Sequence, residues 1–326
     1  MKILIADKFE QQGIDELKHL GCSVQFDPGL KGPALIDALQ QSGADVLVVR
    51  STRVTRETLA GTKPLRMVIR AGSGYDTIDV AAAAELGIRV CNCPGLNAVA
   101  VAELTIGLMV ALDRRIVDAT VDLRHRVWNK KGYSNGRGLK GRTLGIVGLG
   151  RIGYEVGRRA AAFDMSLLYT DAIENKELEA KLGIRKVPLD ELLSESDFIT
   201  LHVPGGAETH HMIGADQLAR MKPTAFLLNC SRGGVVDEQA LAAAVDAGTV
   251  GGAGVDVFEI EPAATDQTFN DPIVDHPNIY GTHHIGASTE QAQAAVAAEV
   301  VRIVRAFQDS GELLHCVNPG PATACP

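Results

Sequence analysis

The sequence predicts an α/β protein with two domains, each built on an open parallel sheet with flanking helices. Short runs of β-branched and aliphatic residues alternate with helical patterns along all 326 residues, and this alternation is typical of strand-helix-strand units. The length also exceeds what one hydrophobic core usually organises. The sheet pattern restarts after a glycine-rich stretch at residues 132–141, so we expect a second domain to begin near that point.

The first portion predicts a compact open-sheet domain. Its expected strands are Lys2–Ala6, Asp45–Val49, Met67–Ile69 and Ile88–Cys91. Its expected helices are Gln11–Leu20, Pro33–Gln41 and Val80–Leu86. A long helical stretch from Ala98 to Val127 follows this portion, after a turn at Pro94-Gly95.

The second portion predicts a larger doubly wound domain. Its expected strands are Thr143–Val147, Ser166–Tyr169, Asp197–His202, Ala225–Asn229, Gly251–Val257 and Asn278–Gly281. A last helix, from Ser288 to Gln308, comes after this set. Hydrophobic periodicity does not say which of the two domains this helix packs against.

Composition excludes several classes of function. The net charge of −8 argues against nucleic-acid binding, which requires a basic face. The most apolar stretch, Val101–Leu112, contains Glu103 and is too short to cross a bilayer. The N-terminus lacks the pattern of a secretory signal. Six cysteines without CxxC or zinc-type spacing fit a reducing, cytoplasmic setting. We interpret His210 and His211 as exposed residues at a helix start, and we expect no metal.

A dinucleotide-binding fingerprint follows the strand that ends at Val147. The pattern Gly148-x-Gly150-x-x-Gly153 closes this strand, and Tyr154–Phe163 continues as a helix. A first glycine permits the turn, a second lets backbone amides approach a pyrophosphate, and a third allows close helix packing. The helix N-terminus then favours two phosphates.

The next strand ends in an acidic residue, Asp171, 18 residues beyond Gly153. Its carboxylate would accept hydrogen bonds from ribose hydroxyls and repel a 2′-phosphate, and residues 172–175 contain no arginine to bind one. The sequence therefore predicts NAD rather than NADP.

Three further segments begin where expected strands end: Asn229–Asp237, Val255–Pro262 and Thr282–Thr289. In doubly wound sheets this edge binds ligands. We therefore expect Arg232, Glu261 and His284 to converge beside the nicotinamide. Taken singly, each has an ordinary structural explanation, as a surface ion pair, a turn carboxylate or a core histidine. The joint motif context favours the functional interpretation.

These motifs resemble those of the D-2-hydroxyacid dehydrogenase family. The resemblance covers nearly the whole chain and is carried by Val49-Arg50-Ser51, Arg70–Gly74, Ala98–Glu103, the loop at 148–153 and the three segments above. Within the family, the chain is most similar to the catalytic core of the phosphoglycerate dehydrogenases. The resemblance implies a Rossmann-type NAD-binding domain, residues 97–284, inserted into a flavodoxin-like substrate-binding domain formed by residues 1–96 and 285–326.

The resemblance also implies a catalytic triad of Arg232, Glu261 and His284, and the chemistry explains these residue types. Oxidation of a 2-hydroxy acid needs a base near neutral pKa, which a histidine supplies. A carboxylate on the other ring nitrogen orients that base. An arginine binds the substrate carboxylate with paired donors. His283 stands where the family commonly has proline; we assign the base to His284 because Ile-Gly-Ala-Ser-Thr follows it.

Other cofactor contacts follow from the same resemblance. It places Asp256 by the nicotinamide amide, with Cys230 and Gly286 in the same pocket. The remaining residues expected at the cofactor are Arg151, Ile152, Val203 and Ser231, together with Arg232 and His284.

The expected substrate site draws on the first domain. Backbone N–H groups at Ser73 and Gly74 should bind the substrate carboxylate, with Asn97 nearby. Arg50 and Arg70 match positions that approach a substrate phosphate in phosphoglycerate dehydrogenases, although both could instead serve domain packing. We therefore expect oxidation of D-3-phosphoglycerate to 3-phosphohydroxypyruvate, in serine biosynthesis.

Two other functions remain open at this stage: a glyoxylate or hydroxypyruvate reductase, and an NAD-sensing binding protein like the C-terminal-binding-protein corepressors. The chain ends at Pro326, so we expect no serine feedback through a further regulatory domain. The apolar helix from Ala98 matches a dimer interface of the family, and we expect a homodimer.

Overall fold

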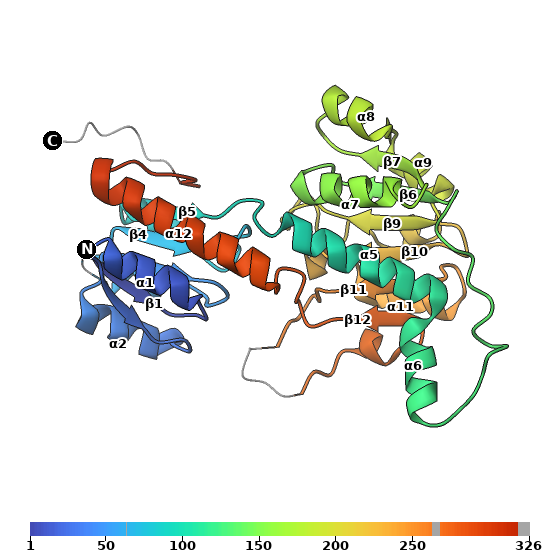
Figure 1. Cartoon of the computed structure of the whole chain (residues 1–326), viewed down its shortest axis with the longest axis horizontal. Coiled ribbons are helices and arrows are strands. Elements are labelled where there is room, and N and C mark those ends of the chain that lie inside the picture. Colours follow the sequence, from blue (N-terminus) through green and yellow to red (C-terminus); the bar gives the residue numbers. More distant parts are fainter. Residues whose placement is uncertain (63, 263–267, 319–326) are drawn as a thin grey trace. The chain divides into compact units, whose positions relative to one another are not determined.

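A computed structural model describes residues 1–62, 64–262 and 268–318 of the chain (Figure 1). The chain divides into two compact units. Unit 1 combines Met1–Asn97 with Ser288–Pro326, and unit 2 is Ala98–Ala287. Unit 2 is thus inserted into unit 1 in sequence, as the family resemblance implies.

Unit 1 contains a parallel sheet of five strands in the order β2-β1-β3-β4-β5. The strands are β1 (Lys2–Ile5), β2 (Ser23–Phe26), β3 (Val46–Val49), β4 (Met67–Arg70) and β5 (Arg89–Asn92). This is the flavodoxin-like strand order, which confirms the expected fold. Strand β2 was missed from the sequence because it lies at the sheet edge with its side chains largely exposed, which removes the buried apolar run that marks the other strands.

Helices cover both faces of this sheet. They are α1 (Gln11–His19), α2 (Gly32–Ser42), α3 (Arg56–Ala60), α4 (Val80–Glu85) and α12 (Glu290–Ser310). The last helix, α12, packs beside α1, and its Val300, Val301 and Val304 share one hydrophobic core with β1 and β3. The C-terminal helix therefore belongs to the unit that contains the N-terminus, which periodicity had left open.

Unit 2 contains a parallel sheet of seven strands in the order β12-β11-β10-β9-β6-β7-β8. The strands are β6 (Thr143–Val147), β7 (Ser166–Thr170), β8 (Arg185–Lys186), β9 (Phe198–Leu201), β10 (Phe226–Asn229), β11 (Gly252–Val255) and β12 (Ile279–Gly281). The strand order reverses between β6 and β9, and such a switch point is where doubly wound sheets bind ligands. The two-residue strand β8 is too short to be recognised from sequence.

The helices of unit 2 are α5 (Ala98–Arg114), α6 (Ile116–Arg124), α7 (Arg151–Ala161), α8 (Lys176–Leu182), α9 (Leu189–Glu195), α10 (Ala215–Leu218) and α11 (Glu238–Asp246). Two short 3-10 turns, η1 (Gly233–Val235) and η2 (Pro272–Asp275), complete it. Helices α5 and α7 share a core with one face of the sheet, and α9, α10 and α11 with the other. In the described part of the chain, no helix combines the length and apolarity that a membrane span requires.

The helical stretch expected from Ala98 to Val127 is present as two helices, α5 and α6. They are separate because Arg115 adopts a left-handed conformation with a φ of 50°. This conformation interrupts a right-handed helix. The broad apolar surface of α5 is also explained within unit 2, since α5 packs on α7, β10 and β11.

A buried ion pair connects the end of α5 to the segment that enters β6. Arg142 Nη1 lies 2.8 Å from Asp113 Oδ1, and the two side chains are 8% and 2% exposed. The other carboxylate oxygen of Asp113 accepts the backbone N–H of Gly138 at 2.8 Å, and the Arg142 guanidinium lies 4.2 Å from the ring centroid of Phe198. These contacts hold the start of the strand that ends at the glycine loop.

Candidate active site

The glycine loop after β6 has three glycines with different surroundings. A Cβ on Gly153 would lie 2.2 Å from the carbonyl oxygen of Gly148, and one on Gly148 would lie 2.7 Å from that of His202. Gly148 also has a φ of 93°. Both glycines are therefore required by backbone packing. Around a Cβ built on Gly150, by contrast, no atom of the described residues comes within 4 Å.

The open space at Gly150 lies at the N-cap of α7, the eleven-residue helix that starts at Arg151 and includes Ile152. This start is three residues earlier than the sequence indicated. Because neither chain packing nor a positive φ requires a glycine at position 150, the absent side chain leaves room for something outside the chain. A pyrophosphate fits both this space and the donors of a helix N-terminus.

Two further residues border the loop. Asp171 follows β7, and its Oδ2 accepts the N–H of Leu149 at 2.7 Å while its Oδ1 accepts that of Ile173 at 3.0 Å. Each carboxylate oxygen retains a second lone pair, so the group can still accept ribose hydroxyls. Val203 follows β9, with its Cγ1 3.1 Å from the Cβ position of Gly148. The residues present therefore fit the adenosine half of NAD.

The structure brings His284 and Glu261 together. His284 Nδ1 lies 2.8 Å from Glu261 Oε2, and the two side chains are 49% and 37% exposed. Burial would raise the pKa of Glu261, but the hydrogen bond and charge of His284, the N–H of Phe258 and the charge of Arg232 outweigh it, so this pKa is lowered. The carboxylate is thus held ionised beside the imidazole. The bond to Glu261 is made by His284 and not by the neighbouring His283.

His284 lies on a strained loop that a buried aspartate anchors. Its φ is 52°, a left-handed conformation that is uncommon outside glycine. Asp256, 2% exposed, accepts the hydroxyl of Thr282 at 2.6 Å and the N–H groups of Ile285 and Gly286, both at 2.8 Å. A Cβ on Gly286 would lie 2.9 Å from this carboxylate. Asp256 thereby fixes the turn that presents the imidazole.

Arg232 lies on the loop between β10 and η1, beside the Glu261 loop. The two loops touch through Gly233, where a Cβ would come within 1.9 Å of the backbone of Phe258. Asn229 holds the Arg232 loop from inside: its side-chain amide donates to the Arg232 carbonyl at 2.9 Å, and its Oδ1 accepts the hydroxyl of Ser231 at 2.8 Å. Three loops at the carboxyl ends of adjacent strands thus carry the three expected residues.

The two residues before Arg232 are internal. Cys230 is buried, and burial raises the pKa of its thiol to about 12. The thiol is therefore neutral and packs in a hydrophobic core of unit 2. Ser231 is 6% exposed, and its hydroxyl is already bonded to Asn229.

In unit 1, the structure brings together two of the expected substrate residues. Ser73 Oγ donates to Asn97 Oδ1 at 2.7 Å and accepts the N–H of Gly95 at 3.0 Å. Gly74 adjoins Ser73 in the same loop. Arg70 is the last residue of β4, and its Nη1 lies 1.5 Å from the position of a Cβ on Gly72, so the guanidinium folds over this loop.

Arg50 follows β3 and points toward α12 within unit 1. Its guanidinium donates to Gln293 Oε1 at 3.0 Å and to Ser288 Oγ at 3.3 Å. The backbone N–H groups of Arg50, Ser51 and Thr52 all bind one carboxylate oxygen of Asp7.

Several of these positioning residues were missed from the sequence. Asp7, Asn229 and Thr282 each stand at or just after the carboxyl end of a strand. That position was the available signal, but only the fold reveals the hydrogen bonds of their side chains.

The interpretation of His210 and His211 as helix-start residues is wrong. Both lie in a turn, and the next helix, α10, begins at Ala215. His211 instead forms a short contact with Glu259.

Comparisons with known proteins show the family to which this chain belongs. The family model for the NAD-binding domain of D-isomer-specific 2-hydroxyacid dehydrogenases matches residues 106–286, more than half of the chain. A D-3-phosphoglycerate dehydrogenase of Methanocaldococcus jannaschii is 42% identical over 94% of this chain and 58% of its own length. A hydroxypyruvate reductase of Thermotoga maritima is 45% identical over 82% of this chain and 85% of its own length.

The fold also matches solved structures. A D-lactate dehydrogenase of Aquifex aeolicus, solved with NAD and lactic acid, has a TM-score of 0.86 and 29% identity, covering 99% of this chain and all of that one. The chain spans about half the length of the phosphoglycerate dehydrogenases it matches, 53% to 58%. The chain therefore belongs to the D-isomer-specific 2-hydroxyacid dehydrogenase family of enzymes, and it contains the NAD-binding domain of that family.

Proposed function

We propose that this chain catalyses NAD-dependent oxidation of a small D-2-hydroxy acid and the reverse reduction of the 2-oxo acid. The observation that carries the proposal is the pair of His284 and Glu261, joined at 2.8 Å and set beside the Arg232 loop at the carboxyl edge of the sheet. The open space at Gly150 supports the choice of cofactor, and Asp171 supports NAD over NADP.

The proposed mechanism uses His284 as the base. Because Nδ1–H donates to the Glu261 carboxylate, the lone pair lies on Nε2, which takes the hydroxyl proton of the substrate. Glu261 stabilises the imidazolium that results, and its lowered pKa keeps it ionised to do so. NAD, when bound, accepts the hydride that leaves C2.

Arg232 would bind the substrate carboxylate with two parallel N–H donors and polarise the 2-oxo oxygen in the reverse reaction. The Asn229 bond to its backbone carbonyl fixes the loop on which it lies. In unit 1, the loop at Ser73 and Gly74 would supply backbone N–H groups to a substrate carboxylate, with Asn97 holding the serine hydroxyl.

For the substrate, we propose D-3-phosphoglycerate, oxidised to 3-phosphohydroxypyruvate. Phosphoglycerate dehydrogenases are among the relatives that cover most of this chain, and Arg50 and Arg70 provide two guanidinium groups in unit 1 for a phosphate. To bind it, Arg50 would exchange its neutral partners Gln293 and Ser288 for a dianion. The second candidate is hydroxypyruvate or glyoxylate reduction. It is favoured because the match with the hydroxypyruvate reductase of Thermotoga maritima covers 85% of that protein's length.

A screen of NADH absorbance with phosphorylated and unphosphorylated 2-hydroxy and 2-oxo acids separates these functions. We expect the highest kcat/KM for the phosphoglycerate pair. Arg50→Ala should lower kcat/KM for that pair by about tenfold or more and leave glyoxylate nearly unaffected. An equal loss for both substrates would contradict a phosphate role for Arg50. Inactivity with every acid, combined with NADH binding, would indicate an NAD-sensing protein instead.

We also propose a homodimer, as the family resemblance implies. A group of exposed apolar residues lies on α6 and just after it, whereas the exposed large apolar residue on α5 is Val99. The residues of this group are Ile116, Val117, Val121, Leu123, Val127 and Trp128, the last 80% exposed. A surface of this kind typically marks an interface. Light scattering at micromolar concentration should give twice the mass of the chain, and a monomer mass would contradict the proposal.

A further inference from the structure

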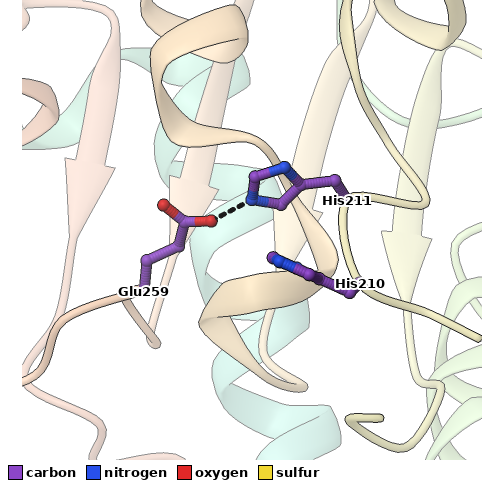
Figure 2. A group of neighbouring side chains, drawn as sticks. All are labelled: His210, His211 and Glu259. Carbon is purple, nitrogen blue, oxygen red and sulfur yellow. Dashed lines mark hydrogen bonds and ion pairs between the residues drawn. The ribbon is translucent and has the colours of Figure 1, made fainter. Parts of the chain in front are cut away.

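We propose that His210, His211 and Glu259 form a binding site for a divalent transition-metal ion of the zinc class. Figure 2 shows the three side chains gathered at one point on the surface of unit 2. This inference is independent of the proposed dehydrogenase activity, and it reverses the expectation from sequence that no metal is bound.

The donor set and its spacing suit such an ion. Two imidazole nitrogens and one carboxylate oxygen are ligands that zinc prefers, and the three ligand atoms all lie within 4.8 Å of one another. Ligand bonds of about 2.0–2.2 Å put two ligands of one tetrahedral ion about 3.3–3.6 Å apart. All three residues are exposed, so their side chains can make the adjustment of about 1 Å that this requires.

The backbone brings the three ligands together from separate loops. The turn at His210 and His211 is joined to the loop before α11, because His211 N–H donates to the Gly234 carbonyl at 2.8 Å. Gly233 of the same loop packs on the backbone of Phe258 and Glu259. The N–H of Glu259 is bound by the buried Glu238 at 2.8 Å. The ligands are therefore attached to fixed backbone before any ion arrives.

The second ring nitrogen of His210 has a hydrogen-bond partner, and that of His211 has a carboxylate within ion-pair distance. His210 Nδ1 lies 3.0 Å from the Gly234 carbonyl oxygen, which only accepts, so the proton is on Nδ1 and the lone pair on Nε2. His211 Nδ1 lies 3.9 Å from Asp237 Oδ2, while its Nε2 faces Glu259. Metal-binding histidines usually have this arrangement, with the other nitrogen directed at a carbonyl or a carboxylate.

An ion pair between His211 and Glu259 explains only part of this arrangement. Such a pair needs one histidine, yet the ring of His210 stands beside that of His211 with centroids 4.0 Å apart and a lone pair on Nε2. A bound ion would replace the proton between His211 and Glu259 and take His210 as its third ligand. Water would complete a four-coordinate site.

The chain contains a matched control. His276 Nε2 lies 3.0 Å from Asp246 Oδ1, which is a histidine–carboxylate pair of the same kind. Among the described residues, the only group of three or more histidine, cysteine or acidic side chains with ligand spacing is His210, His211 and Glu259. Metal binding should therefore depend on His210, His211 and Glu259 and not on His276.

The experiment is calorimetric titration of the metal-free full chain with Zn²⁺ alone, repeated with Ni²⁺ and with Mg²⁺. A Cys325→Ser background removes a thiol that lies outside the described residues. We expect one Zn²⁺ per chain and no heat with Mg²⁺, which prefers all-oxygen sites. His210→Ala and Glu259→Gln should each weaken Zn²⁺ binding by about tenfold or more, and His276→Ala should not change it.

Thermal unfolding with and without Zn²⁺ gives a second measurement, since an ion that binds only the folded chain raises Tm. This increase should disappear in Glu259→Gln, whose circular dichroism spectrum confirms that it folds. The proposal is wrong if the parent chain binds no Zn²⁺. It is equally wrong if His276→Ala weakens binding as much as His210→Ala does. Neither result depends on dehydrogenase activity.

Discussion

The two units differ in how they hold the side chains expected to act. In unit 2, buried anchors and exposed functional groups are different residues: Asp256 fixes the loop, and His284 stands half exposed upon it. In unit 1 one residue is expected to do both, because the Ser73 hydroxyl bonds Asn97 and Gly95 and the Ser73 backbone N–H is proposed to bind the substrate. Substitutions should therefore separate function from stability in unit 2 and mix them in unit 1.

The largest effect is expected at His284. His284→Asn should lower kcat for hydroxy-acid oxidation by about 10²–10⁴-fold, which is the usual contribution of a general base. Its thermal stability should change by less than about 1 kcal/mol, because the side chain is half exposed. Steady-state kinetics and a melting curve on the same preparation test the separation. A large loss of stability would mean that function and anchoring are not separate in unit 2.

The anchors of unit 2 should show the opposite pattern. Asp113→Ala removes the nearer acidic partner of Arg142, whose side chain is 8% exposed, and leaves only Asp197 Oδ1 at 3.9 Å, so unfolding should become easier by up to about 3–5 kcal/mol. Lys140→Ala removes an exposed pair with Asp164 and should cost less than about 1 kcal/mol. Urea unfolding of both variants measures the difference. Equal losses in the free energy of unfolding would show that burial does not strengthen the Asp113–Arg142 pair.

A pH effect is expected from His202, which follows β9. Burial lowers its pKa from the usual 6.5 to about 3, so between these values the unfolded chain binds a proton that the folded chain does not. Stability is therefore complete above pH 6.5 and is lost as pH falls, by about 2 kcal/mol at pH 5. Melting curves at pH 8 and pH 5 should show a smaller drop in His202→Gln than in the parent chain. An identical drop in both would exclude His202 as a cause.

The smallest effect is expected in unit 1. Ser73→Ala removes hydroxyl bonds to Asn97 and Gly95 and should lower stability by about 1–2 kcal/mol. Because the same loop is proposed to bind the substrate carboxylate, KM should rise several-fold while kcat changes little. In this one variant, KM should therefore rise and Tm should fall together. An unchanged Tm with a raised KM would show that unit 1 also separates the two roles.

The fold was predictable where its strands are buried and apolar. Strands β1, β3 and β4 each contain three or four consecutive apolar residues that are buried, and such runs are visible in the sequence. The exposed edge strand β2 and the break at Arg115 were not predictable. An edge strand has no buried pattern, and a left-handed arginine has no residue-type signal of the kind that glycine provides.

The candidate site was predictable as a set of residues and not as a set of contacts. The pattern at 148–153 indicates a nucleotide loop by itself, because each glycine has a local reason that sequence spacing preserves. The anchors Asp256 and Asn229 act through hydrogen bonds to loops whose proximity only the strand order creates.

By itself, the sequence determined the family, the glycine loop and the identity of the expected triad, because these depend on residue types at short, fixed spacings. Only the tertiary structure decided that His284, and not His283, meets Glu261, that α12 joins unit 1, and that His211 meets Glu259. The physical reason is that these contacts join residues far apart in the chain: 23 residues for Glu261 and His284, 48 for His211 and Glu259, and 286 for Cys22 and Gln308 of α12. Such contacts form only after the strands of each sheet have paired and brought distant segments together.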